Sequence, residues 1–189
     1  MELCASIALM INIWLAAKAK YSNFYFGIVA VSLYFLIFLN AKLYAVMSLQ
    51  LIFLTLQFYG LYQWQLGGTH HEPLPIRCAT FAELFWVIAI TLIIWPILWV
   101  ILWRYTDSTV VWLDTLITLL SLAAQYMLSK KWVENWWLWA IVDVCSIVLY
   151  LKKSLYYTSM MYFILLLVCI EGYRVWHRNA KQIFLRPEV

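Results

Sequence analysis

Seven apolar segments, each close to the length of a membrane-spanning helix, follow one another along this chain of 189 residues. A helix needs about 20 mostly apolar residues to cross the hydrocarbon core of a bilayer. Short polar breaks separate the segments, which cover residues 3–17, 24–39, 43–64, 81–102, 110–128, 136–151 and 155–176. The pattern predicts an all-α integral membrane protein with seven transmembrane helices.

The composition supports this class and excludes others. Hydrophobic residues make up 66% of the chain and charged residues 12%, whereas soluble domains have roughly 45–50% and about 25%. Twelve Trp and thirteen Tyr are typical of proteins whose rings gather at the membrane interfaces. A disordered chain, a secreted disulfide scaffold and a nucleic-acid-binding module are excluded. We therefore assign the net charge of +4 to residues that flank spans.

Basic residues predict the orientation. With seven crossings, the breaks alternate between two sides, and the side richer in Lys and Arg is cytoplasmic. One side collects nine basic residues: Lys18, Lys20, Arg77, Lys130, Lys131, Arg174, Arg178, Lys181 and Arg186. The other collects four: Lys42, Arg104, Lys152 and Lys153. We expect the N-terminus outside and the C-terminus in the cytoplasm. Glu2 stands where a signal peptide would carry basic residues, so we interpret the first segment as a span.

An offset of 112 residues brings marked positions together, which indicates an internal repeat. The pairs are Glu2 with Asp114, Lys18 with Lys130, Asn23 with Asn135, Leu43-Tyr44 with Leu155-Tyr156, Gly60 with Gly172, and Trp64 with Trp176. We expect both asparagines to cap helices. The predicted organisation is a first three-helix repeat (1–64), a loop and linker helix (65–109), a second three-helix repeat (110–176) and a basic cytoplasmic tail (177–189).

The linker helix fixes how the two repeats relate. Because it is a single crossing, the second triplet enters the membrane in the same direction as the first. A 3+1+3 arrangement of two parallel three-helix repeats is known in secondary transporters, which bind substrate near mid-membrane and alternate access. In the alternative interpretation, the duplication only builds a stable bundle.

An acid lies in the middle of the sixth apolar segment, at Asp143. Such a residue costs about 2.5–3.5 kcal/mol on insertion scales, so it should face the bundle interior and have a role. The repeat places Val31 at the equivalent position, so the fold does not require an acid there. This contrast favours a functional role.

Two tryptophans share a helix face with this acid. Trp136, Trp139 and Asp143 are spaced i, i+3 and i+7, which places them on one side of a helix. Indole faces attract cations by about 0.5–2 kcal/mol, so the set suits a flat aromatic ligand with positive charge. The alternative is an interfacial Trp belt with an acid that packs or relays protons.

Glutamines in two spans are weaker candidates for substrate binding. Gln50 and Gln57 are seven residues apart on one helix face, and Gln125 lies in the fifth span. Amides can bind ligand hydroxyls, but they also join helices. The four cysteines, Cys4, Cys78, Cys145 and Cys169, lack metal-ligand spacing. With no zinc, nucleophile-elbow or phosphate-loop motif, we expect no cofactor and no bound metal.

The stretch WVENWWLWAIVDVCSIVLYLKKSLYYTSMMYFILLLVCIEGYRVW resembles the C-terminal half of PnuC-type vitamin transporters. Their Trp-x-x-Trp-x-x-x-Asn/Asp hallmark corresponds to Trp136, Trp139 and Asp143, while NFYFG, NAKLYAVMSLQ and YGLYQW resemble the first half. The resemblance implies a SWEET-like 3+1+3 fold, a homotrimer and residence in the bacterial inner membrane. It also implies facilitated diffusion of an unphosphorylated vitamin that is later trapped by phosphorylation.

The resemblance leaves the vitamin open. Nicotinamide riboside ranks first, and thiamine follows closely, since both are cations that suit Asp143. Riboflavin is neutral and gains least from the acid. Carriers of the riboside tend to have Asn at the positions of Asp143 and Ala30, where this chain departs from them. Two other classes stay open: an intramembrane enzyme that uses Asp143 as acid or base, and a non-transporting membrane subunit. With only one buried acid, we expect transport without Na⁺ or H⁺ coupling.

Overall fold

The computed structural model describes residues 1–42, 44–68, 71–105, 111–152 and 154–184. Seven helices lie within these ranges: α1 (Glu2–Ala17), α2 (Asn23–Asn40), α3 (Tyr44–Leu66), α4 (Phe81–Tyr105), α5 (Val111–Ser129), α6 (Asn135–Lys152) and α7 (Tyr156–Phe184). Each corresponds to one predicted segment. The predictions that fall on Leu43, Val110, Lys153 and Arg186 lie outside the described residues.

Five of the seven helices are long and apolar enough to cross a membrane within the described ranges, namely α2, α4, α5, α6 and α7. The expectation of seven spans is therefore met by length and composition for five. α1 has 16 residues, which at 1.5 Å per residue gives about 24 Å, short of a typical hydrocarbon core. α3 has the length, with 23 residues, but is not among the five.

The last helix is longer than predicted. α7 continues through Phe184, so residues 177–184 of the expected tail are helical. The ring of Tyr173 stacks on that of His177 one turn later, with centroids 5.5 Å apart. This i,i+4 contact supports the helix beyond the end that we predicted at Trp176.

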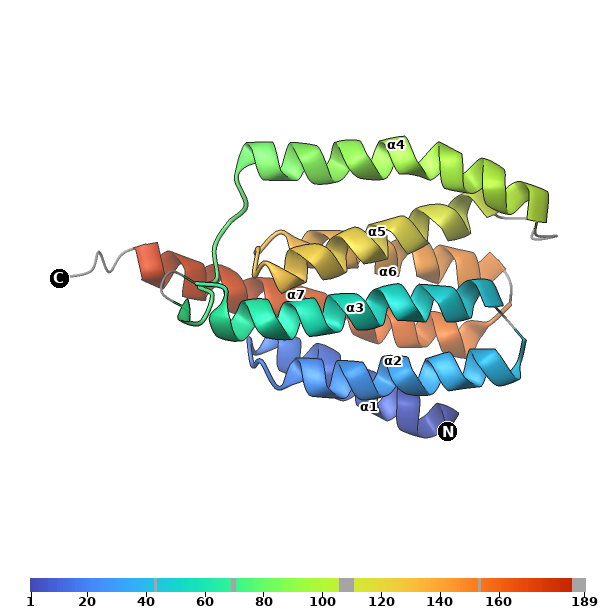
Figure 1. The fold of residues 1–189 in the computed structure, drawn as a ribbon, viewed down its shortest axis with the longest axis horizontal. Coiled ribbons are helices and arrows are strands. Elements are labelled where there is room, and N and C mark those ends of the chain that lie inside the picture. Colours follow the sequence, from blue (N-terminus) through green and yellow to red (C-terminus); the bar gives the residue numbers. More distant parts are fainter. Residues whose placement is uncertain (43, 69–70, 106–110, 153, 185–189) are drawn as a thin grey trace.

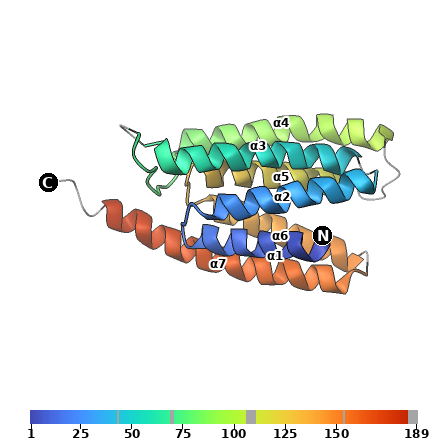
Figure 2. The same cartoon turned by 60° about the horizontal axis from the view of Figure 1, so that its bottom comes forward.

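The helices form two sequential triplets and one peripheral helix (Figures 1 and 2). In the first triplet, α2 packs between α1 and α3; in the second, α6 packs between α5 and α7. The triplets meet through α3 against α5 and α1 against α7. α4 packs on α5 and has only 6% of its span buried. It lies along the outer edge of the bundle in Figure 1.

Aromatic contacts between the triplets come in pairs offset by 112 residues. Trp64 Nε1 donates to the Leu128 carbonyl at 3.0 Å, and Trp176 Nε1 donates to the Ala16 carbonyl at 3.0 Å. Each bond joins one triplet to the other. Within the triplets, Phe24 meets Trp64 edge-on at 5.0 Å, and the equivalent Trp136 meets Trp176 edge-on at 5.5 Å.

Turn conformations repeat at the same offset. Ala19 and Lys131 have φ of 55° and 54°, and Lys42 and Ser154 both have φ of 58°. These are left-handed conformations that residues other than glycine rarely adopt. Their recurrence at positions 112 residues apart shows that the corresponding turns of the two triplets have the same backbone shape.

The two asparagines that we predicted as helix caps act differently. Asn23 Nδ2 donates to the Lys20 carbonyl at 2.7 Å, and Asn135 Nδ2 donates to the Trp132 carbonyl at 2.6 Å. Each amide thus closes the turn before its helix instead of accepting a hydrogen bond from the helix N-terminus. Both side chains are fully buried.

The hydrophobic core cluster lies at one end of the bundle, where α1, α3 and α5 end and α2 and α6 begin. We call this the basic end, because Lys18, Lys20, Arg77, Lys130 and Lys131 surround it. Its centre is a cluster of fully or almost fully buried rings, made of Phe24, Trp64, Trp136 and Trp176. Its four rings come from α2, α3, α6 and α7, so the cluster contains residues of both triplets.

Candidate functional site

Asp143 lies inside the bundle, as its cost in a membrane requires. It stands half-way along α6 with 3% of its surface exposed. The thiol of Cys169, on α7, donates to Asp143 Oδ2 with a sulfur–oxygen distance of 3.3 Å. The carboxylate thus keeps further acceptor capacity, since each of its oxygens can accept two hydrogen bonds.

The two predicted tryptophans of α6 differ in their surroundings. Trp136 is 3% exposed, and a Cβ added at Gly172 of α7 would lie 2.7 Å from its ring atoms. Only glycine lets α7 approach this indole so closely. Trp139, one turn further, is half-buried beside the aromatic cluster. Trp136 therefore has a largely packing environment, while Trp139 is only partly buried and lies one turn before Asp143 on the same helix.

The first triplet contributes a pair of buried amides. Gln57 is 5% exposed and Asn12 6%, and both reach into the space that Gly27 leaves free on α2. A Cβ on Gly27 would lie 2.5 Å from Gln57 Oε1 and 2.6 Å from Asn12 Nδ2. Asn12 Nδ2 donates to the Asn23 carbonyl at 2.7 Å. Gln57 Oε1 has no hydrogen-bond partner among the described residues.

The two triplets carry different residues at positions that are 112 apart. At the offset of 112, Gly27 is equivalent to Trp139 and Gln57 is equivalent to Cys169. The second triplet thus has an indole where the first has a glycine without a side chain, and a thiol where the first has an amide. An asymmetric ligand with an aromatic ring and a polar part suits such an arrangement.

Six further buried side-chain atoms lack partners within the described part of the chain: Oδ1 of Asn23 and of Asn135, and Nε1 of Trp132 and of Trp136, together with two that bear on the site. Those two are Nε2 of Gln125 on α5 and Oγ of Ser146, one turn after Asp143 on α6. Gln125 is 5% exposed and Ser146 1%. Buried donors and acceptors are usually satisfied, and a bound ligand is one way to satisfy them. Gln50 is only half-buried, so the structure does not enclose it as it encloses Gln57.

Sequence reasoning missed Asn12 and Ser146. Asn12 is a polar residue in the middle of an apolar segment, which was an available signal. Ser146 lies three residues after Asp143, but a serine in a membrane helix commonly bonds to its own backbone, so its spacing alone carried little weight.

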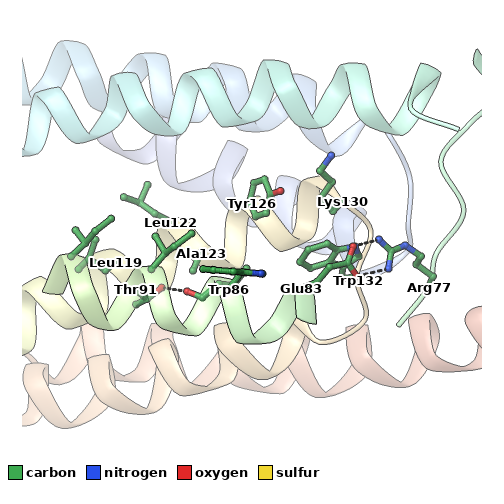
Figure 3. A pocket seen from close by; sticks show the side chains of 13 residues that line it. Arg77, Glu83, Trp86, Thr91, Leu119, Leu122, Ala123, Tyr126, Lys130 and Trp132 are labelled. Carbon is green, nitrogen blue, oxygen red and sulfur yellow. Dashed lines mark hydrogen bonds and ion pairs between the residues drawn. The ribbon is translucent and has the colours of Figure 1, made fainter. Parts of the chain in front are cut away.

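Two surface grooves lie away from these residues. A groove of about 600 Å³ runs between α4 and α5, and Figure 3 shows Arg77, Glu83 and Trp132 at one end of it. A second, of about 260 Å³, lies between α1 and α7. Neither is lined by a residue predicted to bind substrate. No group of three potential metal ligands exists among the described residues.

A buried lysine and a loop cover the basic end. Lys131 is 9% exposed; its Nζ donates to the Leu74 carbonyl at 2.6 Å and lies 4.7 Å from the centroid of the Trp64 ring. Burial lowers the pKa of Lys131 to about 8. Arg77 pairs with Glu83 at 2.6 Å, and the hydrogen bond raises the pKa of Arg77.

The backbone of this loop is fastened to the turn between α5 and α6. Arg77 N donates to the Lys131 carbonyl at 3.2 Å, and Val133 N donates to the Arg77 carbonyl at 3.0 Å. Ala79 N donates to Glu134 Oε2 at 2.9 Å. The segment from Leu74 to Ala79 is thereby held against the second triplet, above Trp64.

Comparison with known proteins finds similar sequences among membrane transporters. A family model described as nicotinamide mononucleotide transporter matches residues 1–178. The nicotinamide riboside transporter PnuC of Escherichia coli K12 is 29% identical over 207 residues, covering 96% of this chain and 86% of its own length. The riboflavin/roseoflavin transporter RibM of Streptomyces davaonensis is 25% identical over 136 residues, covering 70% of this chain and 64% of its own.

A solved structure agrees with these relatives. The crystal structure of the vitamin B3 transporter PnuC matches with a TM-score of 0.69 and 27% identity, covering 96% of this chain and 83% of that one. The relatives are transporters, which removes the interpretation of Asp143 as the acid or base of an intramembrane enzyme. The chain is a multi-pass membrane transporter and belongs to the nicotinamide mononucleotide transporter family.

Proposed function

We propose that this protein takes up unphosphorylated nicotinamide riboside by facilitated diffusion, and that phosphorylation in the cytoplasm then traps it. The main support is that the similarity to a nicotinamide riboside transporter covers 96% of the chain. The buried acid Asp143 and the partly buried ring of Trp139 on the same helix add to it. The riboside is a flat cation, so Asp143 supplies the opposite charge and Trp139 a ring face. Thiamine is less favoured, because the relatives named above carry nicotinamide riboside or riboflavin.

The proposed substrate-binding residues are Trp136, Trp139, Asp143, Gln50, Gln57 and Gln125. The free Oε1 of Gln57 and the free Nε2 of Gln125 support amide contacts to the ribose hydroxyls, because a ligand there would satisfy both atoms. Asp143 is enclosed beside Cys169, where low polarity strengthens its attraction for a cation. Trp136 is proposed to hold Trp139 in place through the helix that they share.

We also propose that the two triplets are parallel repeats in a 3+1+3 arrangement, with α4 as the linker. The reciprocal bonds of Trp64 and Trp176 across the triplets and the matching left-handed turns support an axis along the membrane normal. Rocking of residues 1–64 against 110–176 would then expose the site to each side in turn.

The orientation, the location and the assembly are further parts of this proposal. Most of the described basic residues, among them Lys18, Arg77 and Lys130, lie at the basic end, whereas Lys42, Arg104 and Lys152 lie at the opposite ends of α2, α4 and α6. This asymmetry supports a cytoplasmic basic end, hence an external N-terminus. The bacterial inner membrane and a homotrimer are proposed from the family resemblance.

Calorimetric binding on the purified protein tests the substrate. Nicotinamide riboside, thiamine and riboflavin are compared, with Trp139→Ala and Asp143→Asn as site variants. Trp137→Ala is the matched control, because Trp137 lies on the same helix but is 58% exposed. We expect the riboside to bind and both site variants to weaken it, while the control does not. Unchanged affinity of Asp143→Asn for every cationic vitamin would refute the assignment of the site. Binding of thiamine alone would refute the assignment of nicotinamide riboside as the substrate.

Uptake by the purified chain in liposomes tests the transport class. We expect the protein alone to admit the riboside, because the chain contains both triplets and the enclosed site. Uptake that requires another protein would leave a non-transporting subunit as the better interpretation.

A further inference from the structure

Two indole hydrogen bonds tie the triplets together at the basic end, and each repeats the other at the offset of 112 residues. Trp64 of the first triplet bonds to Leu128 of the second, and Trp176 of the second bonds to Ala16 of the first, both at 3.0 Å. We propose that Trp64 and Trp176 form the gate that closes the basic end, and that opening this end breaks both bonds together. The inference rests on the proposed function, since it assigns the gate of that transport cycle.

The two bonds can act as a gate because of where they lie between the triplets. The triplets meet only through α3 against α5 and α1 against α7 among the principal helix contacts of the described chain. One indole bond lies on each of these two interfaces. The triplets therefore cannot separate at the basic end without losing at least one bond, and a symmetric separation loses both.

The two rings also close the space between the interfaces. Their centroids are 5.6 Å apart at an interplanar angle of 58°, and Trp64 and Trp176 are 2% and 0% exposed. Buried aromatic pairs of this geometry attract each other. The two rings themselves are therefore almost wholly closed off from solvent.

The gate lies directly beside the proposed site. Trp176 meets Trp136 edge-on at 5.5 Å, and Trp136 lies one turn from Trp139 and two turns from Asp143 on α6. A ligand held by Trp139 and Asp143 therefore has the Trp136–Trp176–Trp64 series between itself and the basic end. Release on that side requires the last two rings to part.

The two sides of the gate are restrained unequally. Lys131 holds its ammonium 4.7 Å from the Trp64 ring and donates to Leu74 of the overlying loop. The residue equivalent to Lys131 is Ala19, which has no such group to place over Trp176. Trp64 thus has a cation and a loop above it, so loss of the Trp176 bond should open the gate more easily than loss of the Trp64 bond.

A native cysteine reports the opening. Cys169 is buried beside Asp143, so an impermeant maleimide reaches it only when the site opens to the side where the reagent is added. Cys4, Cys78 and Cys145 are replaced by Ser, and vesicles of both orientations are labelled. Separate protein with Cys78 alone identifies the side of the basic end, because Cys78 is exposed there.

The variants are Trp64→Phe, Trp176→Phe and the double variant, which remove the indole N–H but keep a ring. Trp95→Phe is the matched control, since Trp95 Nε1 also donates to a carbonyl, that of Trp112, at 3.1 Å. That bond joins α4 to α5 and crosses no interface between the triplets. A net hydrogen bond of ordinary strength is worth roughly a 2- to 12-fold change in an equilibrium constant.

We expect Trp64→Phe and Trp176→Phe to raise the rate of Cys169 labelling from the Cys78 side by roughly 2- to 12-fold each, with the larger effect for Trp176→Phe. Trp95→Phe should leave the rate unchanged. Rates that match the control, or that rise equally from both sides, overturn the gate. Lys131→Met, which leaves both indoles in place, should also raise the rate and serves as a further test if a Phe variant does not fold. No vitamin is needed in this assay, so its outcome does not depend on whether nicotinamide riboside is the substrate.

Discussion

The space above Gly27 offers a sharp test of the amide side of the site. Gly27→Ala adds one methyl group to α2, and this methyl would lie 2.5 Å from Gln57 Oε1 and 2.6 Å from Asn12 Nδ2. Ordinary contact begins near 3.4 Å. The Gln57 amide must therefore retreat by roughly 0.9 Å, the difference of those two distances. A displacement of this size moves its free oxygen out of hydrogen-bonding position.

The expected magnitude has two parts. Adding a methyl group to a packed interior costs about 1–3 kcal/mol, so the thermal midpoint of the purified variant should fall. Loss of one ligand hydrogen bond costs about 0.5–1.5 kcal/mol, which corresponds to roughly 2- to 12-fold weaker binding of nicotinamide riboside.

The assay is calorimetric binding within a double-mutant cycle of Gly27→Ala and Gln57→Ala. Because the methyl acts through the Gln57 amide, it should weaken binding in the wild-type background and have little further effect once that amide is absent. Val29→Ile is the control, since it adds one carbon to the same helix at a position that is 51% exposed.

Equal losses of affinity from Gly27→Ala in both backgrounds would refute the reasoning, because the methyl would then act on something other than Gln57. Unchanged affinity in both backgrounds would remove Gln57 from the site. A lower thermal midpoint with unchanged affinity would show that the amide serves packing alone.

Three further predictions concern pH, coupling and orientation. The pKa of Lys131 is about 8, below its ordinary 10.5, so between these pH values the unfolded state binds more protons than the folded state. The contribution of Lys131 to the free energy of unfolding should therefore increase as pH rises through this window. The thermal midpoint of Lys131→Met should lack this part of the increase. Initial uptake of nicotinamide riboside into vesicles should be unaffected by a protonophore, since Asp143 is the one fully buried acid among the described residues, and a collapse of the rate would contradict uncoupled transport. In sealed cells, an impermeant maleimide should label protein with Cys4 alone and spare protein with Cys78 alone, as both thiols are exposed at opposite ends; the reverse pattern would invert the proposed orientation.

The helices could be predicted from the sequence because they depend on local spacing. Long apolar segments specify helices in a membrane whatever their neighbours are. The structure gives α2 and α6 as Asn23–Asn40 and Asn135–Lys152, which differ by 112 at both ends, as the spacing of marked residues indicated. The burial of Asp143 likewise follows from the cost of an acid in lipid.

Packing between helices decided what spacing could not. Trp136 and Trp139 share a helix face, yet Trp136 is enclosed because Gly172 of α7 comes close to it. Gln50 and Gln57 also share a face, but only Gln57 meets the free space at Gly27. These contacts depend on which residue of another helix stands opposite, and no periodicity within one helix contains that information.

The sequence by itself determined that this is a membrane bundle of seven helices with a buried acid, because apolar length and the cost of a charge in lipid act on each segment separately. Only the tertiary structure decided that Lys131 turns inward over Trp64, that Asn12 and Gln57 fill the space beside Gly27, and that Trp64 and Trp176 bond across the triplets. The physical reason is that each of these contacts joins residues far apart in the chain, and their partners are set by how the helices pack.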